Sequence, residues 1–353
     1  MQVIEADGDR VPWARGWQVS APPAGTPEAF FQEARDFWWT REQPVSGKLP
    51  VPYHRIPPPV RSFLARQLGR FKRGQLETVM PQWPLDLSAD YWYDYLHQRR
   101  LRIEDPEGRT YVLLSHDLDS REGTEQFLEF FDPLEREMGA RSANYVVVGK
   151  ADFSLELARE IRDRGHEVGI HGFDHSNTTP FLPQEAILER LKTALEPVAE
   201  LEPRGYRAPS LLRTPALLEG LKVYFEYDSS MPSSGGLFPQ SNQGCFSARP
   251  FRLDSLWELP VSLPRDGSLR FLGYDPETIL EIWKHCAEQI QAGGGVVSLL
   301  THCETMFSGN PEMLSAYRGF LEAMAGDSRF VFGTTETVIA AAERQPLPAY
   351  PLM

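Results

Sequence analysis

Two histidines four residues apart raise the question of what this protein does. His171 and His175 stand in the stretch HGFDH, directly after the apolar run EVGI. Imidazole is a common metal ligand, but an isolated pair with this spacing more often belongs to a protein surface or core. The interpretation changes because Asp117 and Asp119 follow another apolar run, in SHDLDS. Two imidazoles and one carboxylate can bind a divalent metal and leave positions open for water or substrate.

Asp117 and Asp119 can serve two different purposes at such a site. Side chains alternate across a strand, so residues two positions apart face the same way while the chain stays extended. One carboxylate could bind the metal while the other transfers protons, since a divalent cation lowers the pKa of bound water toward roughly 7. The simpler alternative is a turn, or an N-cap for the next helix that includes Ser120. The motif by itself leaves both interpretations open.

Further polar side chains stand at the ends of other apolar runs. Arg207 occurs in GYRAPS, Asp228 in YDSS and His302 in LLTH. His302 suits general acid catalysis because the pKa of imidazole lies near neutrality, and Asp228 could orient it. Arg207 could keep Asp117 ionised through charge-assisted hydrogen bonds. The structural alternatives are a buried histidine bonded to the backbone, a turn aspartate and an ordinary ion pair.

The elements that must position these residues begin near residue 109, where short apolar strands alternate with helical patterns. Apolar strands separated by helices indicate a parallel sheet covered by helices. Repeated units of this kind favour an α/β fold of the deformed (β/α)7–8 barrel type, whose functional residues gather at the carboxyl ends of the strands. Pro133 is expected to kink the first helix. We predict strands at 110–117, 143–149, 166–172, 205–210, 224–230, 256–262, 295–303 and 329–335, and helices at 124–139, 154–165, 184–200, 276–293 and about 311–325.

The first part of the chain differs in character, because it is irregular and rich in proline and aromatic residues. We predict an N-terminal extension over residues 1–105 and the barrel over residues 106–353. The extension is expected to cover the outer surface or the bottom of the barrel. Residues 61–75 predict a short basic helix, and residues 231–255 a long glycine-rich loop of the kind that covers binding sites.

Composition excludes several classes of function. The net charge of −13 and the pI of about 5.2 disfavour binding to nucleic acids, because such a surface repels phosphate backbones. The three cysteines form an odd set without a CxxC pair, which argues against a disulfide framework. The sequence contains no run of roughly 18 apolar residues and no signal-peptide pattern at its start. We therefore expect a cytoplasmic protein without a membrane span.

Five motifs in this order resemble the polysaccharide deacetylase family, also called the NodB homology domain or carbohydrate esterase family 4. The resemblance extends over roughly residues 109–340. SHDLDS is similar to the family's first motif, usually TFDDG, and HGFDHS to the second, H-(S/T)-x-x-H. GYRAPS is similar to the third motif, R-x-P, YDSS to part of the fourth, and LLTH to the fifth, L-x-x-H.

The resemblance implies a role for each of these residues. Asp119, His171 and His175 would bind a divalent metal, most often Zn²⁺, with Co²⁺ or Ni²⁺ as alternatives. Asp117 would be the base that activates water, and His302 the acid that protonates the leaving amine. Arg207 would position Asp117, and Asp228 would tune His302. Two departures stand out: Leu118 separates the family's adjacent carboxylates, which leaves open whether Asp117 or Asp119 is the base, and Gly172 replaces a serine or threonine.

Taken together, these features predict a metal-dependent hydrolase that removes an N-acetyl group from a sugar, a glycan or a glycan precursor. One alternative keeps the fold and the metal but acts on a non-sugar amide or a cyclic amide, as in allantoinase-like relatives. A second alternative is a non-catalytic glycan-binding relative, which the presence of Asp117, Arg207 and His302 disfavours. The sequence does not predict the oligomeric state.

Overall fold

A computed structural model describes residues 1–43, 67, 69, 71, 73–235 and 243–352 of the chain. Most of the predicted basic helix at 61–75 lies outside these residues. The same holds for positions 236–242 of the predicted loop at 231–255. Within the described ranges, no helix is both long enough and apolar enough to cross a bilayer.

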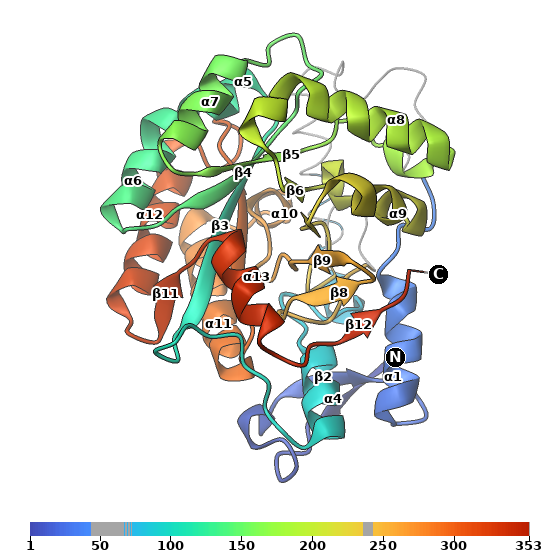
Figure 1. The fold of residues 1–353 in the computed structure, drawn as a ribbon. Helices are drawn as coiled ribbons and strands as arrows, with labels where there is room; N and C mark the ends of the chain where they lie inside the picture. The colour runs from blue at the N-terminus through green and yellow to red at the C-terminus, as the bar shows by residue number, and fades with distance from the viewer. Residues whose placement is uncertain (44–66, 68, 70, 72, 236–242, 353) are drawn as a thin grey trace.

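The fold is built around one ten-stranded sheet with the strand order β10-β3-β4-β5-β6-β7-β9-β8-β12, and β11 also pairs with β3 (Figure 1). All these pairs are parallel except β8 with β9. The predicted parallel α/β arrangement is therefore confirmed. The strands are β3 (Thr110–Leu118), β4 (Ser142–Val146), β5 (Glu167–Ile170), β6 (Gly205–Tyr206), β7 (Tyr227–Asp228), β8 (Phe251–Leu253), β9 (Leu256–Glu258), β10 (Val297–His302), β11 (Phe330–Phe332) and β12 (Ala349–Tyr350).

The irregular stretch 259–263 closes the gap between β7 and β10. Its backbone N–H groups bond to Asp228 and Met231 near β7, at 2.9 Å each, through Leu259 and Val261. Leu263 N–H then bonds to the Ser298 carbonyl on β10 at 3.0 Å. The stretch therefore makes strand-like backbone hydrogen bonds, near β7 on one side and to β10 on the other. These bonds close the curved sheet into a barrel.

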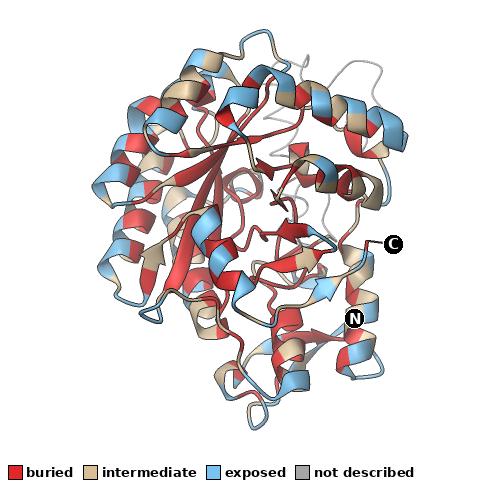
Figure 2. Cartoon of the chain, viewed as in Figure 1, coloured by how far each residue is buried: buried red, intermediate tan, exposed pale blue. Residues whose placement is uncertain are grey.

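Helices cover the outside of the sheet, with buried residues on their inner sides and exposed residues on their outer sides (Figure 2). Side-chain caps fix where several of them begin, because Ser154, Thr214, Asp275 and Asn310 each accept a bond from the backbone N–H three residues later. The main helices after the first strand are α7 (Leu155–Asp163), α8 (Gln184–Leu195), α9 (Pro215–Tyr224), α10 (Asp266–Phe271), α11 (Pro276–Gly293), α12 (Pro311–Gly326) and α13 (Thr335–Glu343).

The predicted helix at 124–139 is divided into three parts, namely α5 (Arg121–Gln126), a π-helical turn at Phe127–Phe131 and α6 (Asp132–Glu137). Pro133 lacks an N–H group and cannot continue the regular bonding pattern. The wide turn just before it, in which Asp132 N–H bonds to the Phe127 carbonyl, accommodates the proline.

The two faces of the sheet pack into two separate cores. Leu113, Tyr145 and Tyr227 belong to a cluster inside the barrel, whereas Val112 and Ile170 belong to the larger cluster under the helices. Since side chains alternate along a strand, the residue after an inward one faces the helices. This parity decides which polar side chains can reach the barrel interior.

The N-terminal extension packs against the barrel at the lower end of the view in Figure 1. It contains the antiparallel pair β1 (Gln2–Glu5) and β2 (Gln18–Ala21), then α1 (Pro27–Ala34) and, further along, α4 (Ser88–His97). Phe30 and Trp92 from the extension form one buried cluster with Phe246, and Ala89 N–H bonds to the Phe246 carbonyl at 2.9 Å. The domain boundary near residue 105 stays a prediction.

Removing Phe246 should detach this aromatic contact and destabilise the whole protein. Phe246 is fully buried, and its ring meets Phe30 edge-on with a centroid separation of 5.5 Å. Phe246→Ala should lower the free energy of unfolding by about 3–5 kcal/mol, the usual cost for a core phenylalanine. The matched control is Phe71→Ala, because Phe71 is 69% exposed. Urea unfolding of both variants tests this, and equal effects would contradict the packing described.

Candidate active site

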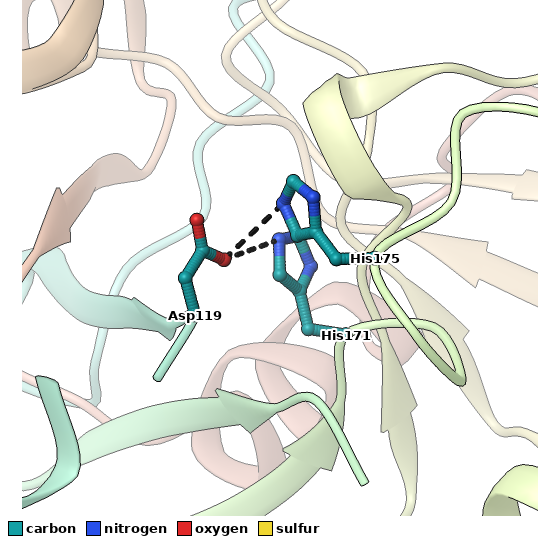
Figure 3. A group of neighbouring side chains, drawn as sticks. All are labelled: Asp119, His171 and His175. Carbon is teal, nitrogen blue, oxygen red and sulfur yellow. Dashed lines mark ion pairs between the residues drawn. The ribbon is translucent and has the colours of Figure 1, made fainter. Parts of the chain in front are cut away.

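Three side chains converge where β3 and β5 end. Asp119 Oδ1 lies 3.4 Å from His171 Nε2 and 3.2 Å from His175 Nε2 (Figure 3). One possible ligand atom from each of the three residues lies within 4.8 Å of the others. Donors placed about 2.0–2.1 Å from a tetrahedral zinc ion lie roughly 3.3 Å apart. The spacing found here matches that value.

The backbone around β5 holds His171 in the orientation that such a site needs. His171 N–H bonds to the Val146 carbonyl at 2.8 Å, which continues the pairing of β5 with β4 by one residue. Its ring Nδ1 donates to the Arg207 carbonyl at 2.9 Å. The free Nε2 therefore points toward Asp119. Burial lowers the pKa of His171 to about 4, despite the opposing effect of Asp117 and Asp119, so the ring is neutral at physiological pH.

The loop that carries His175 explains one departure from the family pattern. Gly172 has a φ of +69°, and a Cβ atom there would lie 2.8 Å from Pro209 Cγ. A serine or threonine at this position would be strained and would collide with Pro209. His175 itself has a φ of 59°, a conformation that non-glycine residues adopt rarely and mostly where a specific geometry is required.

The chemistry of these groups fits a divalent metal. Asp119 Oδ1 is buried and has no hydrogen-bond partner, although the rest of the residue is partly exposed. A buried carboxylate oxygen without a partner is costly unless a cation faces it. Burial raises the pKa of Asp119, but His175 and His171 lower it more, and the net direction is downward. The three residues therefore offer one anionic oxygen and two imidazole nitrogens to the same point.

Asp117 lies next to this group and is held by Arg207. Asp117 Oδ1 accepts a bond from Arg207 Nη1 at 3.2 Å, and Asp117 Oδ2 lies 3.5 Å from His171 Nε2. Both Asp117 and Arg207 are 1% exposed. Asp117 and Asp119 thus face the same side, as the alternation predicts, and the geometry gives them different neighbours. Asp119 points at both imidazoles, whereas Asp117 points at the guanidinium.

His302 approaches from the opposite side, on the strand that pairs with β3. His302 is the register partner of Asp117, and its Nε2 lies 3.9 Å from Asp117 Oδ2. Its Nδ1 bonds to Asp266 Oδ1 at 2.8 Å, and its backbone N–H bonds to Asp266 Oδ2 at 2.8 Å. Burial lowers the pKa of His302, but Asp266 and then Asp117 and Asp119 raise it more, to about 9. The ring is therefore a protonated donor beside Asp117.

The expectation that Asp228 orients His302 is wrong, because Asp228 faces away from the site. Its neighbour Tyr227 points into the barrel, so Asp228 points outward, where its Oδ1 accepts a bond from Ser230 Oγ at 2.7 Å. The carboxyl group of Glu258, its register partner on β9, lies beside it. Burial raises the pKa of both groups. Asp228 therefore belongs to a buried carboxyl pair outside the site.

Asp266 takes the place that the sequence reasoning gave to Asp228. It begins α10 and is fully buried, and it also accepts a bond from Ser308 Oγ at 2.7 Å. The sequence contains a signal, since the segment LPRDG places Asp266 three residues after the end of the apolar run LPVSL. This run forms the irregular closing stretch, so its pattern does not mark Asp266 as the residue that ends a strand.

The region around Asp119 also serves to begin a helix. Ser120 is the N-cap of α5 and accepts a bond from Gly123 N–H. Its hydroxyl donates to Glu304 Oε1 at 2.8 Å, and burial followed by Asp119 raises the pKa of Glu304 to about 8. Of the two interpretations of the segment SHDLDS, the helix cap by Ser120 is observed, and the functional role of Asp117 and Asp119 stays a prediction. Cys303 lies in the outer core.

Comparisons with known proteins identify a similar family and similar folds. Residues 104–224 match the polysaccharide deacetylase family model. No curated protein matches the chain in sequence. A structure assigned as a polysaccharide deacetylase from Mycobacterium smegmatis has 21% identity and a TM-score of 0.57, covering 71% of this chain and 97% of its own.

Two further solved structures share the fold at lower identity. One, assigned as a polysaccharide deacetylase from Pseudomonas aeruginosa PAO1, has 15% identity, a TM-score of 0.55 and coverage of 74% of this chain and 98% of its own. The other is the Puue allantoinase, with 14% identity, a TM-score of 0.57 and the same two coverages. At such identities the likeness concerns the fold alone. The likeness to the polysaccharide deacetylase family rests on the matched residues 104–224, which contain Asp117, Asp119, His171, His175 and Arg207.

Proposed function

We propose that this protein is a metal-dependent hydrolase that removes an N-acetyl group from a sugar, a glycan or a glycan precursor. The family supports a hydrolase of the deacetylase type. The observation that carries the finer proposal is that Asp117 lies between a candidate metal site and a protonated imidazole, 3.5 Å from His171 Nε2 and 3.9 Å from His302 Nε2. The proposed base Asp117, the proposed acid His302 and the candidate cation site thus lie around the same position, where an amide group could react.

Asp119, His171 and His175 would hold the ion, with zinc as the first candidate and cobalt or nickel as alternatives. A divalent ion in this position polarises a carbonyl group and makes water a stronger acid. The neutral state of His171 favours such binding, because a protonated imidazole cannot coordinate.

Asp117 is the proposed base. The attacking water gives its proton to Asp117 as its oxygen forms a bond to the amide carbon. Arg207 fixes the direction of this carboxylate through the charge-assisted bond at 3.2 Å. The guanidinium itself is held by Ser229, whose carbonyl accepts from Arg207 Nε at 2.7 Å. The base is therefore placed by a chain of buried bonds.

His302 is the proposed acid. It gives its proton to the nitrogen of the amide as the C–N bond breaks, and the products are acetate and a free amine. Asp266 holds the ring by Nδ1, which leaves Nε2 as the proton donor. The proton that Asp117 has taken up can return to His302, because Nε2 lies 3.9 Å from Asp117 Oδ2. The enzyme is then ready for another cycle.

A second candidate keeps these roles and changes the substrate. The Puue allantoinase has the same TM-score as the Mycobacterium smegmatis protein, so the fold supports a cyclic amide as much as a sugar amide. The cytoplasmic location expected from the sequence stays a prediction.

A substrate screen tests the proposed function directly. The purified protein, loaded with zinc, cobalt or nickel, is incubated with N-acetylated sugars, nucleotide sugars and glycolipids, and acetate is measured. Acetate release from any of these supports the proposal. Ring opening of ureides without acetate would favour the second candidate. Metal binding without turnover of any amide would indicate the non-catalytic relative.

Zinc binding should depend on the imidazoles of His171 and His175. His171→Ala should bind far less than one zinc per chain, because it removes one of the three proposed ligands. His285→Ala is the matched control, since His285 is exposed on α11 and lies outside the site. Zinc content after gel filtration, measured by mass spectrometry, checks this. Full zinc content in His171→Ala would contradict the assignment of the ligands.

Loss of the acid should separate turnover from metal binding. His302→Ala should lower kcat by about 10²–10⁴, the usual contribution of a general acid, while zinc content stays that of the wild type. The measurements are acetate release with the best substrate of the screen and zinc content. If His302→Ala instead abolishes zinc binding, the assignment of His302 as the acid and of Asp119, His171 and His175 as the ligands is wrong.

The pH dependence follows from the raised pKa of His302. Only the protonated ring can donate, so kcat should fall as pH rises through about 9. Asp266→Asn removes the carboxylate that most raises this pKa and should move the alkaline limb down by roughly 1–3 units. Asp163→Asn, at an exposed site on α7, serves as the control. An unmoved limb in Asp266→Asn would show that another group is the acid.

A further inference from the structure

A buried polar network lies on the outer face of the sheet, directly behind the two catalytic strands. His116 Nδ1 lies 2.8 Å from Thr301 Oγ1, and His116 Nε2 lies 2.7 Å from Glu135 Oε1. His116, Glu135 and Thr301 are each 0% exposed. None of them touches the metal site, and the proposed reaction uses none of them.

The register of the strands connects this network to the chemistry. His302 is paired with Asp117, and Thr301 is paired with His116, one residue earlier on both strands. Because side chains alternate, the inner pair carries the acid and the base, and the outer pair carries the hydrogen bond. The bond between His116 and Thr301 therefore ties β3 to β10 at the position where the spacing of acid and base is set.

The polar character of this outer pair calls for an explanation. Val112 and Leu114 on β3, and Val297 and Leu299 on β10, face the same helices and belong to the large outer core. Apolar residues would satisfy the packing equally well, and a buried polar pair stabilises a fold no better than a well-packed apolar one. What the polar pair adds is a defined distance and direction between two strands.

The network is anchored on the helices as well as on the sheet. Glu135 Oε1, from α6, also accepts a bond from the Tyr317 hydroxyl of α12 at 2.8 Å. Burial raises the pKa of Glu135, but His116 and then His166 lower it more, so this group is a carboxylate. The Glu135 carboxylate accepts a hydrogen bond from His116 Nε2, and His116 Nδ1 lies within hydrogen-bond distance of the Thr301 hydroxyl.

We propose that His116 and Thr301 are positioning residues, which fix the separation of Asp117 and His302 from behind the sheet. Their effect on the reaction rests on the proposed function, whereas their effect on the geometry does not. Asp117 must accept a proton and His302 must donate one at the same amide group. An error of about 1 Å in their separation lowers the rate by a factor on the order of 10².

Thr301→Val tests the bond with little change in shape. Crystal structures of the zinc-loaded wild type and variant should show the separation of Asp117 Oδ2 and His302 Nε2 lengthened from 3.9 Å, and this measurement needs no substrate. With a substrate, kcat should fall by roughly ten- to a hundred-fold, while KM and zinc content stay unchanged. Thr301→Ser, which keeps the hydroxyl, should restore most of kcat.

Two kinds of control separate positioning from general stability. Thr110→Val removes a hydroxyl from the other end of β3, where Thr110 is equally buried and its Oγ1 has no partner, so kcat should stay that of the wild type. His116→Asn retains a polar group near the Nδ1 position and should keep more kcat than His116→Gln, which retains one near Nε2.

The outcomes distinguish the two proposals. If the separation and kcat of Thr301→Val equal those of the wild type while only the melting temperature falls, the network is structural and the inference is overturned. If the wild type releases no acetate from any substrate, the proposed function fails, and the crystallographic separation still decides the positioning role. If Thr301→Val does not fold, the comparison of His116→Asn with His116→Gln decides it by the same two readouts.

Discussion

The structure of the site depends on one buried ion pair, between Arg207 and Asp117. A guanidinium with 1% exposure is tolerated only because every side of it has a partner. Its Nη1 donates to Asp117 and Ser115, its Nε and Nη2 donate to Ser229, and its Cζ lies 4.2 Å from the centre of the Tyr145 ring. The pair therefore joins β3, β4, β6 and the end of β7 at one level of the barrel. A carboxylate held in this way has a fixed orientation, as the proposed base requires.

The packing below the ion pair shows how the sheet makes room for it. Tyr145 fills the barrel under the guanidinium because its neighbour on β5 is Gly169, where a Cβ would lie 2.6 Å from the Tyr145 ring. The tyrosine hydroxyl bonds to Tyr227 at 3.1 Å, which closes the interior with aromatic side chains. The groups of the candidate site thus lie next to a layer of buried aromatic side chains inside the barrel.

Much of this arrangement could be predicted because it follows from local patterns. The runs before Asp117, His171 and His302 are apolar, so their strands and the polar residues at their ends were recognisable. The alternation of side chains along a strand predicts that Asp117 and Asp119 face the same side of the sheet, and in the structure both carboxylates lie near His171 Nε2. The gathering of Arg207 with Asp117 follows from parallel strands ending at one edge.

The remaining features depend on contacts between distant segments, which local patterns do not contain. Asp266 and His302 are brought together by the irregular stretch 259–263, whose hydrogen bonds replace those of a regular strand. The outward direction of Asp228 could not be predicted. It follows from the inward direction of its neighbour Tyr227, whose hydroxyl bonds to that of Tyr145 inside the barrel. The π-helical turn before Pro133 and the pair β1 and β2 likewise arise from packing that single segments do not reveal.

The matched family segment ends at residue 224, and this boundary divides the site in two. The proposed cation ligands, the proposed base and Arg207 all lie before it, whereas His302 and its partner Asp266 lie after it. Under the proposed function, protonation of the leaving nitrogen and binding of the ion are therefore carried by separate segments of the chain, so a substitution of one segment can leave the task of the other intact.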